Sequence, residues 1–349
     1  MHPLLDLVTR PSELPRVSLL TRPATLALTL GDRLWIADDS DIADAYAGNK
    51  VRKLEFLLGD ALRRGAKRVV TVGAIGSHHA LATTVYARQC GLLSHVLQFP
   101  QPLNPHVETN LAALLEQGAT TTLVDHPSHL PRHILLAQLR SLLGDDCYIP
   151  GGGSSACGAL GYANAGLWLV EALRARGADM PERLYVTAGT AGTLAGLALG
   201  LGLAGVTSTT VVGVRVTDRI VCNQTLVRQL LRGQITLLQR AGGPRMPALP
   251  RIELTGRFFG KGYGIPLPAA EQALRRGASE GIKLDSTYTA RTYAALLEDL
   301  DRHPGATFLY WHTLNARPLG PLLPRTPRAW PKPHRDRIPG LPPLMPWSS

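Results

Sequence analysis

Short apolar runs alternate with stretches of helical periodicity over most of this chain, and this alternation restricts the folds that the chain can adopt. Val211–Val214 carries no polar side chain, as a strand covered on both faces requires. Repeated strand–helix units predict an α/β fold with mostly parallel sheets flanked by helices. The expected strands are residues 68–72, 94–99, 120–124, 183–187 and 210–215, and the expected helices are residues 51–64, 77–90, 105–117, 133–143, 158–176 and 193–203.

The length and composition are those of a two-domain globular protein. A chain of 349 residues predicts two domains, at about 100–200 residues each. Hydrophobic residues make up 45% of the chain and aromatic residues only 5%, so small aliphatic side chains build the core. Every long apolar run is interrupted by charges, Gly or Pro, and residues 1–21 lack the apolar stretch of a secretory signal. We therefore expect a cytoplasmic protein that does not bind membranes.

Residues 317–349 differ in composition from the rest of the chain. They hold 10 of the 27 prolines and, with six basic and one acidic residue, supply +5 of the net charge of +11. Proline lacks a backbone donor, and the segment has no helical or strand periodicity. We expect a disordered tail whose deletion leaves the fold and the activity intact. The remaining positive charge forms no basic stripe, so we expect no nucleic-acid partner.

The four cysteines, at positions 90, 147, 157 and 222, are widely spaced and form no CxxC pair. This spacing does not support a zinc site or a disulfide framework. We interpret the cysteines as small buried side chains and expect no bound metal.

Three motifs could carry chemistry, and the first is residues 48–55 (GNKVRKLE). In it, Lys50 follows a Gly-Asn turn at the start of an expected helix. Lysine amines condense with aldehydes and act as bases when their pKa is lowered. Considered alone, a lysine at this place is more often solvated than catalytic.

The second motif, residues 187–196 (TAGTAGTLAG), follows an apolar strand and begins a helix. Glycines let the backbone close around an anion, threonine hydroxyls donate hydrogen bonds, and the helix N-terminus adds partial positive charge. The motif lacks the GK[ST] of a P-loop and does not match GxGxxG. It predicts a phosphate cradle, with a tight turn that binds nothing as the alternative.

The third motif, residues 73–80 (GAIGSHHA), is again a strand, a turn and a helix start. Its amides, the hydroxyl of Ser77 and an imidazole suit a substrate carboxylate, and the alternative is a capped helix with one structural histidine. His78 and His79 cannot share a helical face, which disfavours a paired-histidine metal site. One lysine, one phosphate loop and one carboxylate-binding turn together suggest pyridoxal phosphate and an amino-acid substrate.

From Leu19 to Asn315 the sequence resembles the 1-aminocyclopropane-1-carboxylate (ACC) deaminase and D-cysteine desulfhydrase family, within the tryptophan-synthase-β-like pyridoxal phosphate enzymes of fold type II. GNKVRKLE is close to the family's GNK-x-RKLE, and GAIGSHH corresponds to G-x-I-Q-S-N-H. The resemblance implies that Lys50 carries the cofactor, that Ser77 faces the substrate, and that Tyr263 and Tyr288 lie near it. It also implies cofactor contacts from His78, Gly189, Thr190, Ala191, Gly192, Thr193, Thr289 and Thr313.

Several positions depart from the family pattern. Gly76 stands in place of the usual Gln, and His78 in place of the Asn that contacts the phenolic oxygen of the cofactor. Leu314 and Asn315 replace the Gly-Gly of the family's closing H-T-G-G. These changes bear more on substrate identity than on cofactor binding.

Two threonines bear on the branch of the family. Thr289 stands where ACC deaminases carry Glu, and Thr313 stands where they lack Thr, so both resemble the desulfhydrase branch. A neutral Thr313 beside the pyridine nitrogen would leave that nitrogen unprotonated more often, which suits elimination.

The resemblance implies a lyase acting on a small amino acid, most simply β-elimination of D-cysteine to pyruvate, ammonia and sulfide. Lys50 would take the α-proton, and Tyr263 or Tyr288 would protonate the leaving group or gate the site. The alternatives are ACC ring opening and a pyridoxal phosphate-binding protein without turnover. We expect Lys53, one turn beyond Lys50, to tolerate substitution.

The resemblance also implies a domain arrangement. Residues 1–50 and 150–316 are expected to form the large cofactor-binding domain and residues 51–149 a small domain. We expect the chain to form a homodimer.

Overall fold

A computed structural model describes residues 3–17, 21–29 and 32–348, so Leu19, where the family resemblance begins, lies outside the described residues. The chain forms two compact units. The large unit contains the residues up to Phe56 together with Ser154–Ala316, and the small unit contains Leu57–Gly153 and the residues from Arg317 onward. The first boundary, after Phe56, lies inside helix α2 (Asn49–Arg63), whereas the sequence predicts it after residue 50. The second boundary lies after Gly153, whereas the sequence predicts it after residue 149.

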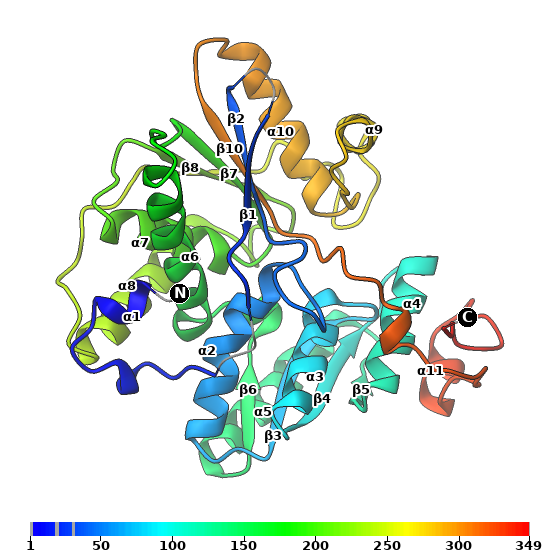
Figure 1. Ribbon diagram of the computed structural model, residues 1–349. Helices are drawn as coiled ribbons and strands as arrows, with labels where there is room; N and C mark the ends of the chain where they lie inside the picture. Colours follow the sequence, from blue (N-terminus) through cyan, green and yellow to red (C-terminus); the bar gives the residue numbers. More distant parts are fainter. Residues whose placement is uncertain (1–2, 18–20, 30–31, 349) are drawn as a thin grey trace. The chain divides into compact units, whose positions relative to one another are not determined.

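A six-stranded sheet in the order β1-β2-β10-β7-β8-β9 forms the centre of the large unit (Figure 1). β1 is antiparallel to β2, and the other neighbouring pairs are parallel. The carboxyl ends of β2, β10, β7 and β8 therefore lie at one edge of the sheet. The strands are β1 (Thr25–Thr29), β2 (Leu34–Asp38), β7 (Arg183–Ala188), β8 (Thr210–Arg215), β9 (Ile252–Thr255) and β10 (Phe308–His312).

Helices cover both faces of this sheet. On one face lie α6 (Ala156–Arg174), α7 (Gly192–Leu203) and α8 (Gln224–Arg240), and on the other lie α9 (Pro268–Ser279) and α10 (Thr289–Arg302) (Figure 1). Along β7, Leu184 and Val186 join the apolar cluster of the first face, whereas Tyr185 joins that of the second. This alternation is the reason that the central strands carry apolar side chains on both faces. A short helix, α1 (Pro3–Asp6), precedes β1.

Glycines bring α6 and α7 into backbone contact. A Cβ atom at Gly196 would lie 2.4 Å from the carbonyl oxygen of Ala159, and one at Gly200 would lie 2.2 Å from that of Ala163. A larger side chain at either position would push the helices apart. The close packing holds the N-terminus of α7 directly after the end of β7.

A four-stranded parallel sheet in the order β5-β4-β3-β6 forms the small unit. Two helices begin at side-chain caps, since Ser77 Oγ accepts from Ala80 N and the Asn104 side chain accepts from Val107 N. The elements are β3 (Arg68–Ala74), β4 (Leu93–Phe99), β5 (Thr120–Leu123), β6 (Asp146–Ile149), α3 (His78–Gln89), α4 (Pro105–Glu116), α5 (Leu130–Leu143) and α11 (Lys332–Arg337).

The C-terminal segment, residues 317–348, packs on the small unit, and here the structure differs from the disordered tail that the composition predicts. Trp330, Ile338 and Met345 are at most 5% exposed and join an apolar cluster that includes Val107 of α4. Prolines prevent a regular helix or strand over most of the segment, but they do not prevent large apolar side chains from being buried.

Among the helices in the described part of the chain, none has both the length and the apolar character that crossing a membrane requires.

Candidate active site

The GNK motif lies at the edge of the large sheet where the parallel strands end. The amide of Gly48 donates to the carbonyl of Asp39, which follows β2, at 2.9 Å, and the amide of Asn49 donates to the carbonyl of Thr313, which follows β10, at 3.1 Å. Gly48 has a φ of +80°, and a Cβ atom there would lie 2.8 Å from the Thr313 carbonyl oxygen. Only glycine fits this turn, and the turn places Lys50 in the first turn of α2.

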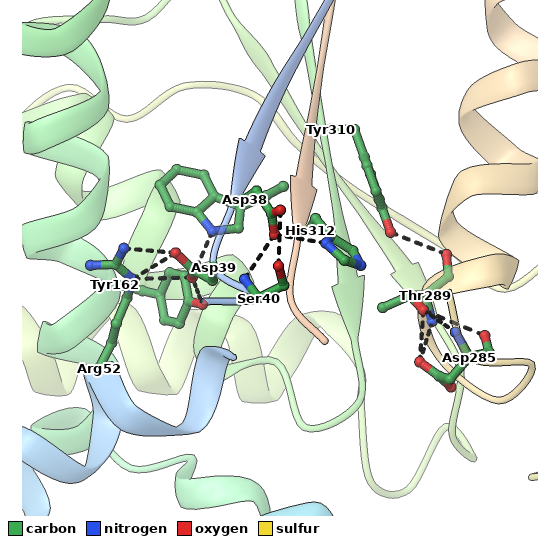
Figure 2. Close-up of polar contacts among 10 residues, drawn as sticks. Asp38, Asp39, Ser40, Arg52, Tyr162, Asp285, Thr289, Tyr310 and His312 are labelled. Atoms are coloured by element: carbon green, nitrogen blue, oxygen red, sulfur yellow. Dashed lines mark hydrogen bonds and ion pairs between the residues drawn. The ribbon is translucent and has the colours of Figure 1, made fainter. Parts of the chain in front are cut away.

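A buried polar cluster holds the start of α2 against β2 and β10 (Figure 2). Asp39 is fully buried and accepts from the guanidinium of Arg52, with the shortest contact 2.7 Å, from Tyr162 Oη at 2.5 Å and from Trp311 Nε1 at 2.9 Å. Its charge is therefore balanced and its oxygens are satisfied. The arginine of the GNK-x-RKLE motif thus has a structural role that fixes the helix carrying Lys50.

Lys50 and Lys53 both extend into buried surroundings of the large unit. Lys50 Nζ donates to Asn49 Oδ1 at 2.9 Å. Burial lowers the pKa of Lys50 to about 8, against the opposing influence of the Asp285 carboxylate. Lys53 is 2% exposed, and burial followed by the positive charge of Lys50 holds its pKa well below the usual range. Two amines so close together favour a bound anion.

The Gly/Thr loop lies beside these amines. Lys53 Nζ donates to Ser154 Oγ at 3.3 Å, and Ser154 Oγ lies 2.6 Å from the hydroxyl of Thr190 and accepts from the amide of Gly192 at 3.3 Å. Ala191 has a φ of +64°, a left-handed conformation that is uncommon for a residue with a side chain and that is found most often at functional sites.

The geometry of the loop supports the phosphate cradle rather than a turn that binds nothing. The N-cap residue of α7, Ala191, makes no side-chain hydrogen bond to the helix. Ser154 engages the Gly192 amide, and the amides that follow it in the first turn are the ones suited to a ligand. A Cβ atom at Gly189 would meet only Tyr288 Cε1, at 3.9 Å, whereas one at Gly192 would lie 2.5 Å from Ser154 Oγ. Space at Gly189, oriented amides, the buried amine of Lys53 and the half-buried Lys50 fit a phosphorylated aldehyde such as pyridoxal phosphate.

The two predicted tyrosines meet beside this loop. The hydroxyls of Tyr263 and Tyr288 are hydrogen-bonded, and their rings pack edge to face at 72° with centroids 6.0 Å apart. Burial is the main cause that raises the pKa of both phenols, and the pKa of Tyr288 lies well above its usual value. Both tyrosines are therefore protonated at neutral pH and able to donate a proton or a hydrogen bond.

Asp285 organises the segment that carries Tyr288 and Thr289 (Figure 2). Its carboxylate accepts from the amides of Thr287, Tyr288 and Thr289, and from the Thr289 hydroxyl at 2.7 Å. The Thr289 hydroxyl, which the resemblance assigns to the cofactor, is thus engaged by Asp285. Tyr310 Oη donates to the Thr289 carbonyl at 3.3 Å and holds the same segment against β10.

His312 and the residues after it complete this edge of the sheet. His312 Nδ1 lies 2.8 Å from Asp38 Oδ1, and the ring extends from β10 toward Thr289 in Figure 2. Its Nε2 is buried and has no hydrogen-bond partner among the described residues, as expected where a ligand supplies the missing polar contact. Asn315, one of the departures from the family, accepts from the amide of Ala47 at 2.8 Å and so supports the GNK turn. Thr313 follows His312, and both it and Leu314 are 8% exposed.

Ser77 and His78 belong to the small unit and are described with that unit alone. Ser77 Oγ caps α3, and His78 Nε2 lies 2.7 Å from His106 Nε2 of α4. Gly76 has a φ of +79°, and a Cβ atom there would lie 2.7 Å from the Val107 Cα. The family's glutamine would therefore be strained at this position. Asn110 donates to the Gly76 carbonyl at 2.8 Å and holds the turn.

Sequence reasoning misses three residues of this site. Lys53 is expected to tolerate substitution, but its amine lies at the Gly/Thr loop. Ser154 lies in a connection without periodicity, and Asp285 precedes α10, which is not among the expected helices. The spacing of Lys53 from Lys50, about one helical turn, is the one available signal, because residues i and i+3 lie on the same face of a helix.

The chain matches the family of pyridoxal-phosphate dependent enzymes over residues 16–313, and it belongs to that family. Among curated proteins it is 32% identical to a nocardicin C-9' epimerase from Nocardia uniformis subsp. tsuyamanensis, over 90% of this chain and 97% of that one. It is also 32% identical to a D-cysteine desulfhydrase from Salmonella schwarzengrund (strain CVM19633), over 87% of this chain and 95% of that one.

Solved structures agree with this assignment. An ACC deaminase homologue aligns with a TM-score of 0.74 at 28% identity, covering 90% of this chain and 95% of that one. A T.th. threonine deaminase aligns with a TM-score of 0.59 at 20% identity, covering 88% of this chain and 97% of that one, and shows the fold alone. The chain is thus a pyridoxal phosphate-dependent enzyme of the D-cysteine desulfhydrase and ACC deaminase group. The predicted fold type II, cofactor and enzyme class are confirmed.

Proposed function

We propose that this enzyme catalyses β-elimination on a small D-amino acid, with D-cysteine and water giving pyruvate, ammonia and sulfide. The observation that carries the proposal is the amine of the half-buried Lys50, with its pKa lowered to about 8 by desolvation, near a Gly/Thr loop that ends at the N-terminus of α7. The similarity to a D-cysteine desulfhydrase along nearly its whole length supports the choice of substrate.

In this proposal, different residues of the large unit accept and donate the protons that an elimination requires. Pyridoxal phosphate, when bound, withdraws electron density from the α-carbon of the substrate. Lys50 has a pKa suited to accepting the α-proton near neutral pH. The hydrogen-bonded Tyr263 and Tyr288 are protonated and can donate a proton to a thiolate as it leaves.

The small unit and the end of β10 supply substrate selection in this proposal. Ser77 and the amides at the start of α3 form a helix N-terminus suited to a carboxylate. Thr313 supplies a neutral hydroxyl in place of a carboxylate at the pyridine nitrogen, which supports elimination over ACC ring opening. His78 offers an imidazole where the family's asparagine contacts the phenolic oxygen.

The test is a comparison of substrates on the purified holoenzyme. D-cysteine should give sulfide and pyruvate in equal amounts, faster than L-cysteine, and ACC should give little keto acid. Lys50→Ala should lose turnover and the bound-cofactor absorbance while its far-UV circular dichroism is unchanged. Lys67→Ala, whose side chain is 75% exposed, is the matched control and should keep both.

Three results would overturn the proposal. Keto acid from ACC alone would identify a ring-opening deaminase, for which the proposed substrate is wrong. Full activity in Lys50→Ala would remove the lysine from the reaction. No keto acid from any amino acid, with the cofactor bound, would identify a pyridoxal phosphate-binding protein without turnover.

A further inference from the structure

Arg291 is a buried arginine in the first turn of α10, and each of its four hydrogen bonds ends on a main-chain carbonyl oxygen. It is 1% exposed. Its Nε donates to Ser286 at 3.4 Å, and its Nη1 donates to Phe258 at 3.3 Å. Nη1 also donates to Phe259, and Nη2 donates to Ile265. A buried cation is costly unless its donors are satisfied, so these carbonyls are what keep the guanidinium in this place.

The four carbonyls belong to the two segments that carry the paired tyrosines. Ser286 lies two residues before Tyr288, at the start of α10. The other three carbonyls lie on both sides of residues 260–264 (GKGYG), the glycine-rich loop that carries Tyr263. One planar guanidinium is therefore bonded to the segment of Tyr288 and to both ends of the loop of Tyr263.

The glycine-rich loop is flexible by composition. Three of its five residues are glycines, and Gly260 and Gly264 have φ values of +66° and +73°. Glycines permit this shape but increase the conformational entropy that is lost when the loop is ordered. Holding the two ends of a loop together reduces that loss. The place of Tyr263 thus depends on how the ends of the loop are held.

The residue before the loop is fixed from a second direction. The guanidinium of Arg215, at the end of β8, lies over the ring of Phe259, 5.1 Å from its centroid. Phe258 is buried in the apolar cluster between the sheet and α10. These contacts anchor one end of the loop, and Arg291 joins the other end, at Ile265, to it.

We propose that Arg291 positions Tyr263 at the hydroxyl of Tyr288 by holding both tyrosine segments on one guanidinium. Arginine suits this role because its N–H groups lie in a rigid planar fork, whereas the donors of a lysine share one nitrogen atom. The inference rests on the proposed function in giving Tyr263 a part in the reaction. The place of Tyr263 itself can be measured without turnover.

The first test is trypsin cleavage of the holoenzyme after Lys261, which is exposed within the loop. Arg291→Lys keeps the positive charge and removes the fork, so cleavage after Lys261 should be about tenfold faster or more, as expected for a segment that opens more readily. Arg257→Lys is the matched control, because Arg257 precedes the same loop with a side chain that is 55% exposed. The control should be cleaved at the wild-type rate.

The second test is an ultraviolet titration of the tyrosines. Burial raises the pKa of Tyr263 in the wild type. In Arg291→Lys its phenol should enter water, and one more tyrosine than in the wild type should then ionise near the ordinary pKa of about 10. Adding Tyr263→Phe to Arg291→Lys should remove the additional phenolate, which identifies the residue that moved.

The third test separates binding from the chemical step. With D-cysteine, Arg291→Lys should lower kcat by about tenfold or more and change KM by about twofold or less, because Tyr263 acts as an acid toward the leaving group in the proposed function. If D-cysteine is not a substrate, the proposed function is wrong, but the trypsin and titration results still decide the role of Arg291.

Two outcomes would overturn the proposal. An unchanged rate of cleavage after Lys261, or an unchanged number of tyrosines ionising near pH 10, would show that Tyr263 keeps its place without the fork. Faster cleavage at many sites, with a lower thermal midpoint, would show that Arg291 only stabilises the large unit. Arg291→Gln, whose amide is shorter and has one nitrogen, repeats the three tests where Arg291→Lys does not fold.

Discussion

Two lysines lie one turn apart in α2, and they have different surroundings in the candidate cofactor site. Lys50 lies at the first turn and contacts Asn49, while Lys53 lies deeper and contacts Ser154 at the Gly/Thr loop. The family resemblance of the GNK motif implies the chemical role of Lys50. We propose that Lys53 binds the phosphate of the cofactor. Burial disfavours the charged form of its amine, and a bound anion beside the amine would offset that cost.

Lys53→Met should have opposite effects on the apoprotein and on cofactor binding. Methionine is close to lysine in volume and carries no charge, so the free energy of unfolding of the apoprotein should rise. The affinity for pyridoxal phosphate should fall by about 10- to 100-fold, since a hydrogen bond to a charged group contributes about 1.5–3 kcal/mol. Fluorescence titration and thermal melts measure the two effects, and unchanged affinity would remove Lys53 from the site.

The lowered pKa of Lys50 predicts a pH dependence of the apoprotein. Only the neutral amine attacks an aldehyde, so the rate of cofactor incorporation should rise with pH through about 8. The unfolded chain holds its lysine protons to about pH 10.4. The free energy of unfolding of the apoprotein should therefore also rise between about pH 8 and pH 10.4. Stopped-flow absorbance measures the rate of cofactor incorporation, and urea titrations measure the free energy of unfolding. In Lys50→Ala the rise of the free energy of unfolding with pH should be smaller.

At the scale of elements, the start of α2 is held by one buried ion pair and its neighbours rather than by helix propensity. Asp39 joins Arg52 of α2, Tyr162 of α6 and Trp311 of β10. These elements are far apart in sequence, and a side chain from each of them donates hydrogen bonds to the Asp39 carboxylate. The cluster thus sets the position of the helix that carries both lysines.

Asp39→Asn should destabilise the large unit by about 3–5 kcal/mol, because it leaves the buried Arg52 without a counter-charge. Cofactor affinity should fall at the same time. Asp44→Asn is the matched control, since Asp44 pairs with Arg22 at the surface with a side chain that is 72% exposed. The control should change the free energy of unfolding by about 0.5 kcal/mol or less. Equal urea midpoints for the two variants would contradict the role given to Asp39.

At the scale of the whole molecule, the C-terminal segment belongs to the small unit. Its apolar side chains share a cluster with Ile75, which precedes Gly76, and with Val107 of α4, which lies against that turn. His334 also contacts Gln98 of β4 at 3.1 Å from a buried position. The segment that composition marks as separable therefore supports the turn that carries Ser77.

Trp330→Ala should destabilise the small unit by about 3–5 kcal/mol, the usual cost of removing a large buried aromatic side chain. Trp347→Ala removes the same side chain from the same segment at a position that is 45% exposed, and it should cost much less. Hydrogen exchange of the amides in β3 and β4 reports on this unit directly. Equal exchange rates in the two variants would restore the interpretation of a disordered, separable tail.

Local sequence patterns are enough to predict the βα repeat, the parallel sheets and the identity of the cofactor. Apolar runs such as Val211–Val214, the glycines of residues 187–196 and the GNK turn follow from backbone and burial rules that act over a few residues. Strands β2 and β10 are not among the predicted strands, although β10 (Phe308–His312) is fully buried, because a short apolar run without flanking periodicity does not identify a strand.

The meeting of distant side chains, by contrast, is visible only in the folded chain. Folding brings Lys53 to the Gly/Thr loop, joins the hydroxyls of Tyr263 and Tyr288, and buries Trp330 of a segment that composition marks as disordered. Sequence patterns do not reveal these features because burial and pairing depend on contacts between residues far apart in the chain. The free energy of such contacts is set by what surrounds a side chain rather than by the residues next to it.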